Sequence, residues 1–140
     1  MKIFTSGKMT GLSRIQATRW RLNFEIKACE IIGSGVVKFV HPSVFFDTTS
    51  DDQSLAREWE INQIMDSDIV VVDLSHISDS IGTHMELGIV EGLSRVRDKK
   101  IWVIGIGEQD TEHPWIDAAV DAKFESVDKA AMFIRDYLTV

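Results

Sequence analysis

The sequence predicts an α/β domain in which helices cover both faces of a parallel β-sheet. Short apolar runs alternate along the chain with longer segments whose apolar residues recur at helical spacing. The run 69–72 is β-branched and apolar at every position, as expected of a strand that is buried on both faces. Strand–helix alternation of this kind favours a parallel sheet. Five such strands favour a flavodoxin-like, doubly wound arrangement.

The first half of the chain contains two expected strands and two expected helices. Residues 2–6 are typical of a first strand, and a glycine-containing turn follows them. Apolar side chains recur at helical spacing through residues 13–32, and Gly33 ends that helix. Residues 36–40 form the next expected strand, which a histidine–proline pair terminates, and a loop leads to a helix over 54–65.

The second half repeats the alternation after the strand at 69–72 and a polar loop. The expected elements are a helix over 82–96, a strand over 101–106, a strand with a weaker apolar pattern around 122–125, and a helix over 128–138. No repeat or interdomain linker interrupts this order. Residues 1–140 are therefore expected to form one domain.

Composition and charge narrow the function classes. The net charge is −7 and no face rich in lysine or arginine stands out, so a nucleic-acid polymer is not an expected partner. A small anionic ligand is compatible with this charge because a few local donors suffice. Cys29 is the only cysteine, which excludes an intramolecular disulfide and fits a cytoplasmic protein. Residues 1–5 predict a strand rather than a signal peptide, and no apolar run is long enough to span a membrane.

The helix over 82–96 predicts a partner subunit. Its apolar residues do not stay on one narrow stripe, and they include Met85, Leu87, Ile89 and Leu93. A helix that is apolar nearly all round is usually buried on more than one side. In so small a domain a second copy of the chain is the simplest cover, so we expect a homodimer.

The richest motif follows the strand over 69–72, at the sheet edge where doubly wound folds bind their ligands. After a loop, Gly82 opens a helix that carries Glu86 in its first turns. Backbone N–H groups and the helix dipole there favour an anion, which would keep Glu86 ionised and could also cradle a phosphate. A carboxylate nucleophile needs such ionisation. The spacing of Thr83 and Glu86 also fits a capping box, in which Glu86 would have no chemical role.

Residues 7–11, 67–72 and 82–88 resemble the nucleoside 2-deoxyribosyltransferase family, which includes 2′-deoxynucleoside 5′-monophosphate N-glycosidases. The resemblance follows the order and spacing of nearly the whole chain, and the stretch Gly-x-x-x-Glu-Leu-Gly is its most specific part. It implies that Glu86 attacks C1′ of a nucleoside or nucleotide, that the base departs, and that a glycosyl-enzyme ester forms. A second base (in a transferase) or water (in a hydrolase) then attacks the ester, as in retaining glycosidases.

The same resemblance implies a second carboxylate. The family usually has an aspartate eight residues ahead of the first aspartate of the acidic strand, and here that position is Glu60, whose side chain is one methylene longer. It would hold or protonate the base and sugar. Glu60 is equally compatible with a solvated helix acid beside Arg57. Asp73, at the carboxyl end of the strand, is another candidate acid.

Ser80 bears on the substrate. At its position, six residues ahead of Glu86, the family's transferases usually carry an acid that accepts a hydrogen bond from the 5′-hydroxyl, and its nucleotide hydrolases carry a serine. Ser80, with Gly82 close by, therefore favours a nucleoside 5′-monophosphate and hydrolysis. The adjacent Asp79 counts against this, because a one-residue loop shift would exchange the two. A plain helix N-cap is the alternative role for Ser80.

The turn after the first strand is a further candidate for substrate binding. Gly7 and Gly11 allow close approach of the backbone to a ligand. Met9 could lie against a base or sugar, and Lys8 could reach a phosphate. The alternative is an ordinary glycine turn with Lys8 in solvent.

His41 and His113 each precede a proline at the end of an element that faces the expected site. The resemblance places His113 in a loop that reaches the neighbouring subunit's site, where it could touch phosphate or base. A surface histidine is the alternative for both. The four histidines show no metal-ligand spacing and no cysteine pair exists, so neither a metal nor a cofactor is expected.

Two other functions fit the sequence. The altered second carboxylate, Glu60, would favour a nucleotide-binding or sensing module without turnover. Related α/β folds also use a glutamate to hydrolyse a larger nucleotide such as NAD, and the segment 45–53 would bear on how large a ligand fits.

Overall fold

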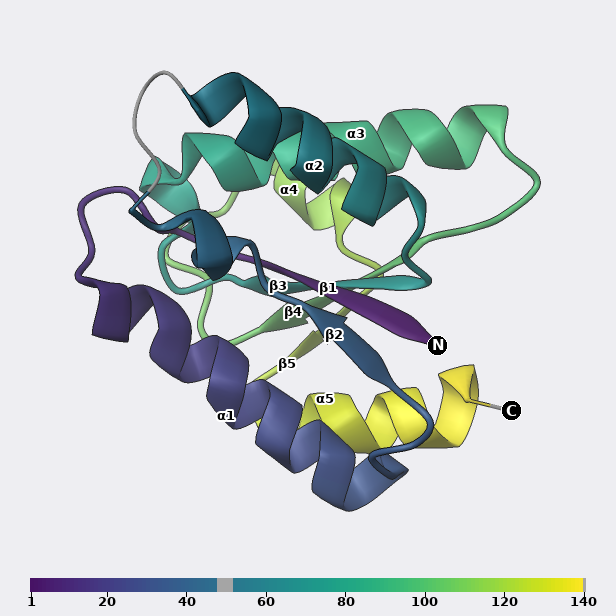
Figure 1. The fold of residues 1–140 in the computed structure, drawn as a ribbon. Helices are drawn as coiled ribbons and strands as arrows, with labels where there is room; N and C mark the ends of the chain where they lie inside the picture. The colour runs from purple at the N-terminus through teal and green to yellow at the C-terminus, as the bar shows by residue number, and fades with distance from the viewer. Residues whose placement is uncertain (48–51, 140) are drawn as a thin grey trace.

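The computed structural model describes residues 1–47 and 52–139. Five strands form one parallel sheet in the order β2-β1-β3-β4-β5 (Figure 1). This is the strand order of a flavodoxin-like doubly wound fold, so the expected fold class is confirmed. The strands are β1 (Lys2–Ser6), β2 (Lys38–Val40), β3 (Ile69–Asp73), β4 (Trp102–Ile106) and β5 (Ala122–Phe124).

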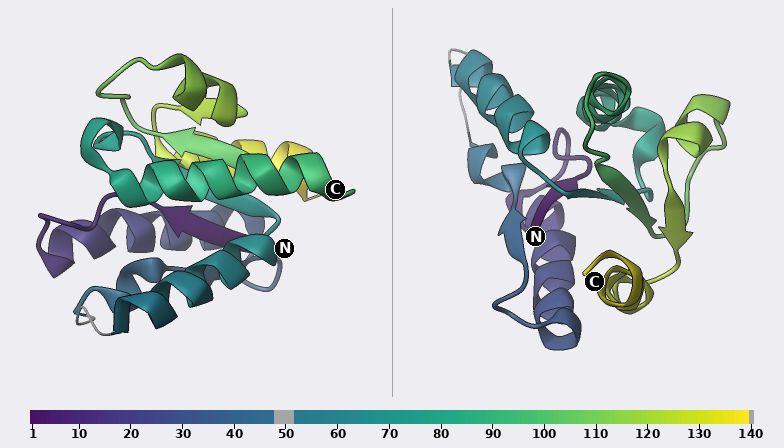
Figure 2. Two further views of the ribbon diagram at one scale, coloured as in Figure 1. Left: turned by 90° about the horizontal axis from the view of Figure 1, so that it is seen from above. Right: turned by 90° about the vertical axis from the view of Figure 1, so that its right-hand side faces the viewer.

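Helices cover both faces of the sheet (Figure 1, Figure 2). On one face α1 packs against α5, and on the other α2 lies beside α3 and α3 beside α4. These helices are α1 (Arg14–Ile32), α2 (Gln53–Met65), α3 (Ile81–Val96), α4 (Pro114–Ala119) and α5 (Val127–Phe133). Shorter turns are η1 (Pro42–Phe45), η3 (Ile77–Asp79) and η4 (Ile134–Leu138), a π-helical extension of α5. Within the described residues no helix is both long and apolar enough to cross a membrane.

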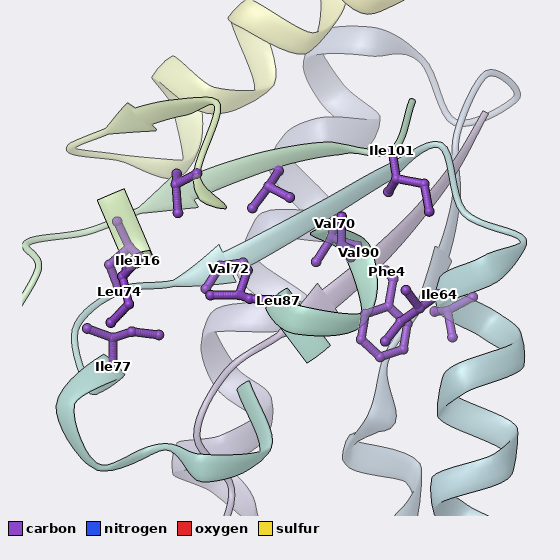
Figure 3. Close-up of a cluster of buried hydrophobic side chains, with 13 residues drawn as sticks. Phe4, Ile64, Val70, Val72, Leu74, Ile77, Leu87, Val90, Ile101 and Ile116 are labelled. Carbon is purple, nitrogen blue, oxygen red and sulfur yellow. The ribbon is translucent and has the colours of Figure 1, made fainter. Parts of the chain in front are cut away.

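Both faces of β3 are buried, which explains why this strand is apolar without alternation. Val70 and Val72 pack with Leu87 in the core beneath α2, α3 and α4 (Figure 3). Val71 belongs to the opposite core, where it clusters with Phe24 of α1 and with side chains of α5. Successive side chains of a strand point to opposite faces, so each of the two cores receives half of β3.

Two local features depart from the expected pattern. The helix α4 lies where none was expected: His113 is its N-cap, accepting a hydrogen bond from the Trp115 N–H at 3.3 Å, and Pro114 fits the first turn, which needs no N–H donor. Six residues are too few to display a helical period. Strand β2 begins at Lys38 rather than at residue 36, because the Val36 N–H closes a turn back to the end of α1 at 3.1 Å.

Candidate active site

The candidate site lies at the carboxyl ends of β1 and β3, which are neighbours in the sheet but not in the chain. The chain leaves β1 for α1 on one face and leaves β3 for α3 on the opposite face (Figure 1). Ligands of doubly wound folds bind at such a divergence. Ser6 ends β1 and Asp73 ends β3, so each strand contributes a polar residue there.

Glu86 reaches this point from the second turn of α3. The Ser6 hydroxyl donates a hydrogen bond to its Oε2. The Thr83 hydroxyl instead contacts the hydroxyl of Ser80 at 2.6 Å, and Ser80, the N-cap, makes no side-chain cap bond. The alternative capping box of Thr83 and Glu86 is therefore not formed, and the Glu86 carboxyl is turned to the end of β1.

Burial is the main influence on the Glu86 carboxyl, and the net result is a pKa raised to about 8. Smaller effects on this pKa come from the Ser6 hydrogen bond, which lowers it, from Glu60, which raises it, and from Arg21, which lowers it. At neutral pH the carboxyl in the free site is therefore mostly protonated. This direction is opposite to the expectation that the helix N-terminus keeps Glu86 ionised, because burial disfavours the charged form of the carboxyl.

Glu60 of α2 is the second acid that acts on Glu86. It is partly buried, and burial raises its pKa while Arg21 lowers it. A carboxyl with a raised pKa can hold a proton and deliver it to a leaving group. Asp73 accepts a hydrogen bond from the Ser75 N–H at 3.0 Å, and its charge also acts on Arg21. The three acids that the sequence singled out thus share one electrostatic neighbourhood.

Arg21 of α1 is the main site residue that the sequence reasoning missed. Its side chain is fully buried, and its Nη2 donates to the Gly7 carbonyl oxygen at 2.9 Å. The guanidinium carbon lies 4.9 Å from the centre of the Trp20 ring, and Nε has no hydrogen-bond partner. The available signal was its place on the apolar face of the helix, four residues after Ala17 and three before Phe24. Ser6, the partner of Glu86, was missed as well.

Gly7 is required by the packing of the turn that follows β1. A Cβ atom at this position would lie 2.9 Å from Cζ2 of Trp20 and 3.2 Å from Cβ of Asp73. Gly11 has a φ of 81°, in the left-handed region that favours glycine. Met9 between them is partly buried. The two glycines thus serve the geometry of the turn itself and bring its backbone next to Asp73.

The turn is tied to the loop before α3 by an ion pair between Lys8 and Asp79. Asp79 is exposed, whereas Ser80 is buried and its hydroxyl is engaged by Thr83. Gly82 is exposed in the first turn of α3, and an added Cβ would meet nothing within 4 Å. The structure therefore pairs Lys8 with Asp79 and leaves the Ser80 hydroxyl in contact with Thr83.

The fold matches that of a 2-deoxyribosyltransferase. The solved structure is that of the enzyme from the psychrotolerant bacterium Bacillus psychrosaccharolyticus, described as a biocatalyst for the synthesis of antiviral and antitumoral nucleosides. The TM-score is 0.65, and the match covers 98% of this chain and 92% of that chain at 15% sequence identity. At this identity the likeness establishes the fold alone. No protein-family model matches the sequence, and no curated protein matches it.

The two candidate histidines have structural partners. His41 contacts the Thr5 hydroxyl through Nδ1 at 2.8 Å and a carboxylate oxygen of Glu25 through Nε2 at 2.6 Å, so both ring nitrogens are occupied within the fold. His113 caps α4. Neither contacts Glu86 in the part of the chain that the structure describes.

His113 lines a groove between α3 and α4 with a volume of about 540 Å³. Leu87 and Ala119 form part of its apolar lining, and Trp115 at the rim is 82% exposed. Met85 of α3 is also exposed. The apolar residues of α3 thus divide between the core and the outer surface, which accounts for the missing stripe in the sequence.

No three histidine, cysteine, aspartate or glutamate side chains within residues 1–47 and 52–139 gather in a way that could hold a metal ion. In the same residues, the carboxylate of Glu60 acts on Glu86, and the carboxylates of Glu86, Asp73 and Glu60 act on Arg21. Carboxyl, hydroxyl and guanidinium groups are the polar groups that the structure brings together at this end of the sheet.

Proposed function

We propose that this protein cleaves the N-glycosidic bond of a nucleoside or a nucleoside 5′-monophosphate, with Glu86 as the nucleophile. One observation carries the proposal: the Glu86 carboxyl from α3 accepts a hydrogen bond from Ser6 at the β1–β3 divergence, and the charge of a second acid, Glu60, acts on it. The family resemblance assigns those two positions to the nucleophile and the assisting acid. The fold shared with a 2-deoxyribosyltransferase supports the same reading.

The chemistry proceeds in two displacements at C1′ of the sugar. In the reactive form the proton that the two acids share lies on Glu60, so that Glu86 is ionised. Glu86 forms a C1′–O bond while the C1′–N bond breaks, and the base leaves with the electron pair. Protonated Glu60 donates its proton to the departing ring nitrogen. Glu60 then takes a proton from water, whose oxygen attacks C1′ and releases Glu86 as a carboxylate. Retention at C1′ follows from the two inversions.

We propose water as the acceptor and a 5′-monophosphate as the favoured substrate, because Ser80 matches the serine of the nucleotide hydrolases. The ion pair of Lys8 with Asp79 brings Lys8 to the start of α3, where Ser80 and Gly82 lie. We place the 5′ group of the substrate there. Lys8 is paired with Asp79 in the free protein, so a phosphate must compete with that carboxylate. Transfer to a second base is the alternative outcome of the same ester.

A non-catalytic nucleotide-binding module is the second candidate, and the raised pKa of Glu86 is the observation that favours it. A neutral carboxyl donates a hydrogen bond to a ligand well but is a poor nucleophile. An NAD-type glycohydrolase depends on the segment 45–53, of which residues 48–51 lie outside the described residues.

We also propose that a second copy of the chain covers the groove between α3 and α4, with Trp115 as an anchor, in a cytoplasmic homodimer. Large exposed aromatic side chains on an apolar groove are typical of interface centres. Analytical ultracentrifugation of wild type and Trp115→Ala tests this: a dimer that becomes a monomer supports it, and a monomeric wild type contradicts it.

The decisive experiment follows release of free base by chromatography from a panel of ribo- and deoxyribonucleosides and their 5′-monophosphates. Wild type is compared with Glu86→Gln and with Glu58→Gln, an exposed acid of α2. We expect release by wild type and Glu58→Gln, and its loss in Glu86→Gln. If wild type releases no base, even with an acceptor base added, while a nucleotide raises its melting temperature, the binding module is the better account.

A further inference from the structure

Arg21 is a buried cation without a countercharge in direct contact. Its side chain is 0% exposed, and its hydrogen bonds go to the backbone carbonyls of Ala17 and Gly7. It makes no ion pair with any described residue. Burying an unpaired charge is costly, and a nonpolar side chain of similar volume would avoid that cost. Packing alone therefore does not explain why this buried position carries an arginine.

The folding of α1 does not supply that reason. Ser13 and Gln16 already form a complete capping box at the start of the helix. The Ala17 carbonyl that accepts from Arg21 is on the same helix, so this bond adds no link to the rest of the fold. Among the hydrogen bonds and ion pairs of the described residues, the 2.9 Å bond from Nη2 to the Gly7 carbonyl is the one that joins Arg21 to another part of the fold.

The charges that act on Arg21 come from three other elements. Glu86 of α3, Asp73 of β3 and Glu60 of α2 each stabilise its protonated form, in that order of strength. Burial lowers the pKa of Arg21 to about 10, so the side chain is still positive at neutral pH. Its field in turn favours the ionised forms of Glu86 and Glu60. Interactions of this kind are stronger in a poorly hydrated site than at the surface.

We propose that Arg21 is a positioning residue that acts through Glu86 and Glu60, as a fixed buried cation that makes an ionised carboxylate available at the end of β1. It holds the Gly7 turn by hydrogen bond and the two acids by charge. This inference rests on the proposed function, because it assigns Arg21 a role in the ionisation of the nucleophile. Two acids that interact share their protons, so Arg21 acts on the pair.

Besides burial, three groups that face Glu86 influence the pKa of its carboxyl. Ser6 from β1 donates a hydrogen bond to it, Glu60 from α2 adds a like charge, and Arg21 from α1 adds the opposite charge. Among the described residues, Arg21 and Glu60 are the charged groups that act on Glu86, and they have opposite signs. Removal of Arg21 must therefore shift the titration of Glu86 to higher pH.

The test compares Arg21→Met and Arg21→Lys with Arg19→Met, an exposed arginine on the same helix. In the pH profile of kcat/KM for base release, we expect Arg21→Met to move the acidic limb up by about one unit or more. Arg21→Lys should keep the limb near its wild-type position, because the charge is retained, and Arg19→Met should match wild type. An Arg21→Met limb that coincides with that of Arg19→Met overturns the inference.

A second measurement separates this inference from the proposed function. The side-chain carboxyl carbons of Glu86 and Glu60 are titrated by NMR, with Glu86→Gln and Glu60→Gln for assignment, and no substrate is needed. We expect the Arg21 Nε signal of wild type to follow the titration of Glu86, and a flat Arg21 response overturns the inference even if Arg21→Met does not fold. Absence of base release by wild type, together with a coupled titration, would sink the proposed function and leave the coupling of Arg21 to the acids established.

Discussion

Charged side chains at the surface and at the candidate site are arranged in opposite ways. On the surface, opposite charges pair directly, as in the 2.9 Å contact between Lys129 and Glu125, where both side chains remain hydrated. At the β1–β3 divergence Arg21 is fully buried and Glu60, Asp73 and Glu86 are partly buried, and the described residues form no direct ion pair among these four. Exposed ion pairs change the folding stability little, whereas burying charges without direct partners destabilises the folded state. Perturbed pKa values of this kind are common where side chains do chemistry, so the buried cluster is the part of the molecule that our proposal assigns to catalysis.

Among the substitutions in the buried cluster, removal of Glu60 should have the largest effect on activity, because it changes both the charge of the cluster and the proton donor. Glu60→Gln should reduce the rate of base release about 100-fold or more. It should also lower the pKa of Glu86, since a like charge is lost, and move the acidic limb of the pH profile downward. Steady-state kinetics across pH measure both effects.

Glu58→Gln is the matched control for that change, because Glu58 lies exposed on the same helix. A Glu60→Gln enzyme as active as this control would show that Glu60 is not the assisting acid. Loss of activity in Asp73→Asn alone would then assign the role to Asp73.

The stability of the protein should depend on pH through Glu86. Its pKa of about 8 in the folded state lies above the ordinary 4.5, so the folded state binds this proton more tightly than the unfolded chain does. The contribution is fully present below about pH 4.5 and is lost as the pH rises to about 8, by up to about 5 kcal/mol of unfolding free energy. Glu86→Gln should be free of this loss.

Urea unfolding at about pH 5, 7 and 9 measures the effect as the difference between wild type and Glu86→Gln. Glu125→Gln is the surface counterpart and should track wild type, because its partner Lys129 is exposed with it. Parallel curves for wild type and Glu86→Gln would show that the Glu86 carboxyl is hydrated after all.

The fold could be predicted from the sequence because a strand that is buried on both faces of the sheet is apolar at every position. The apolar run of β3 and the helical spacing around Phe24 identified sheet and helices, and the number of strands favoured the observed order. The helix α4 escaped because six residues hold less than two turns, and its start depends on a proline and a histidine cap. Local patterns therefore recover the long elements and miss the shortest one.

The site was only partly predictable. Spacing and family resemblance singled out Glu86 and Glu60, and the structure places both in one electrostatic neighbourhood. Arg21 was missed because a charged residue in a helix is ordinarily solvated, and its burial depends on the Gly7 turn and other parts of the fold that the spacing along α1 does not reveal. The raised pKa of Glu86 escaped for the same reason: desolvation depends on residues far away in the chain.

Gly7→Ala tests how closely the turn must approach the cluster. The added methyl group would lie 2.9 Å from Cζ2 of Trp20 and 3.2 Å from Cβ of Asp73, so one of these neighbours would have to shift. We expect a loss of about 1–3 kcal/mol in unfolding free energy and slower base release. Gly35→Ala is the control, because a Cβ there meets nothing within 4 Å and its φ is not positive. Equal unfolding curves for the two variants would mean that Trp20 moves aside freely.

The smallest expected effect concerns the ion pair between Lys8, in the turn after β1, and Asp79, in the loop before α3. Asp79→Asn removes the carboxylate that competes with a phosphate, so KM should fall several-fold for a nucleoside 5′-monophosphate and stay unchanged for the nucleoside. Lys8→Met should raise KM for the monophosphate alone. If Asp79→Asn instead raises KM for the nucleoside, Asp79 is the acceptor for the 5′-hydroxyl, and the protein acts on nucleosides. In either case Lys8 and Asp79 would recognise the 5′ group of the substrate, and the cluster of Glu86, Glu60 and Arg21 would act on the glycosidic bond.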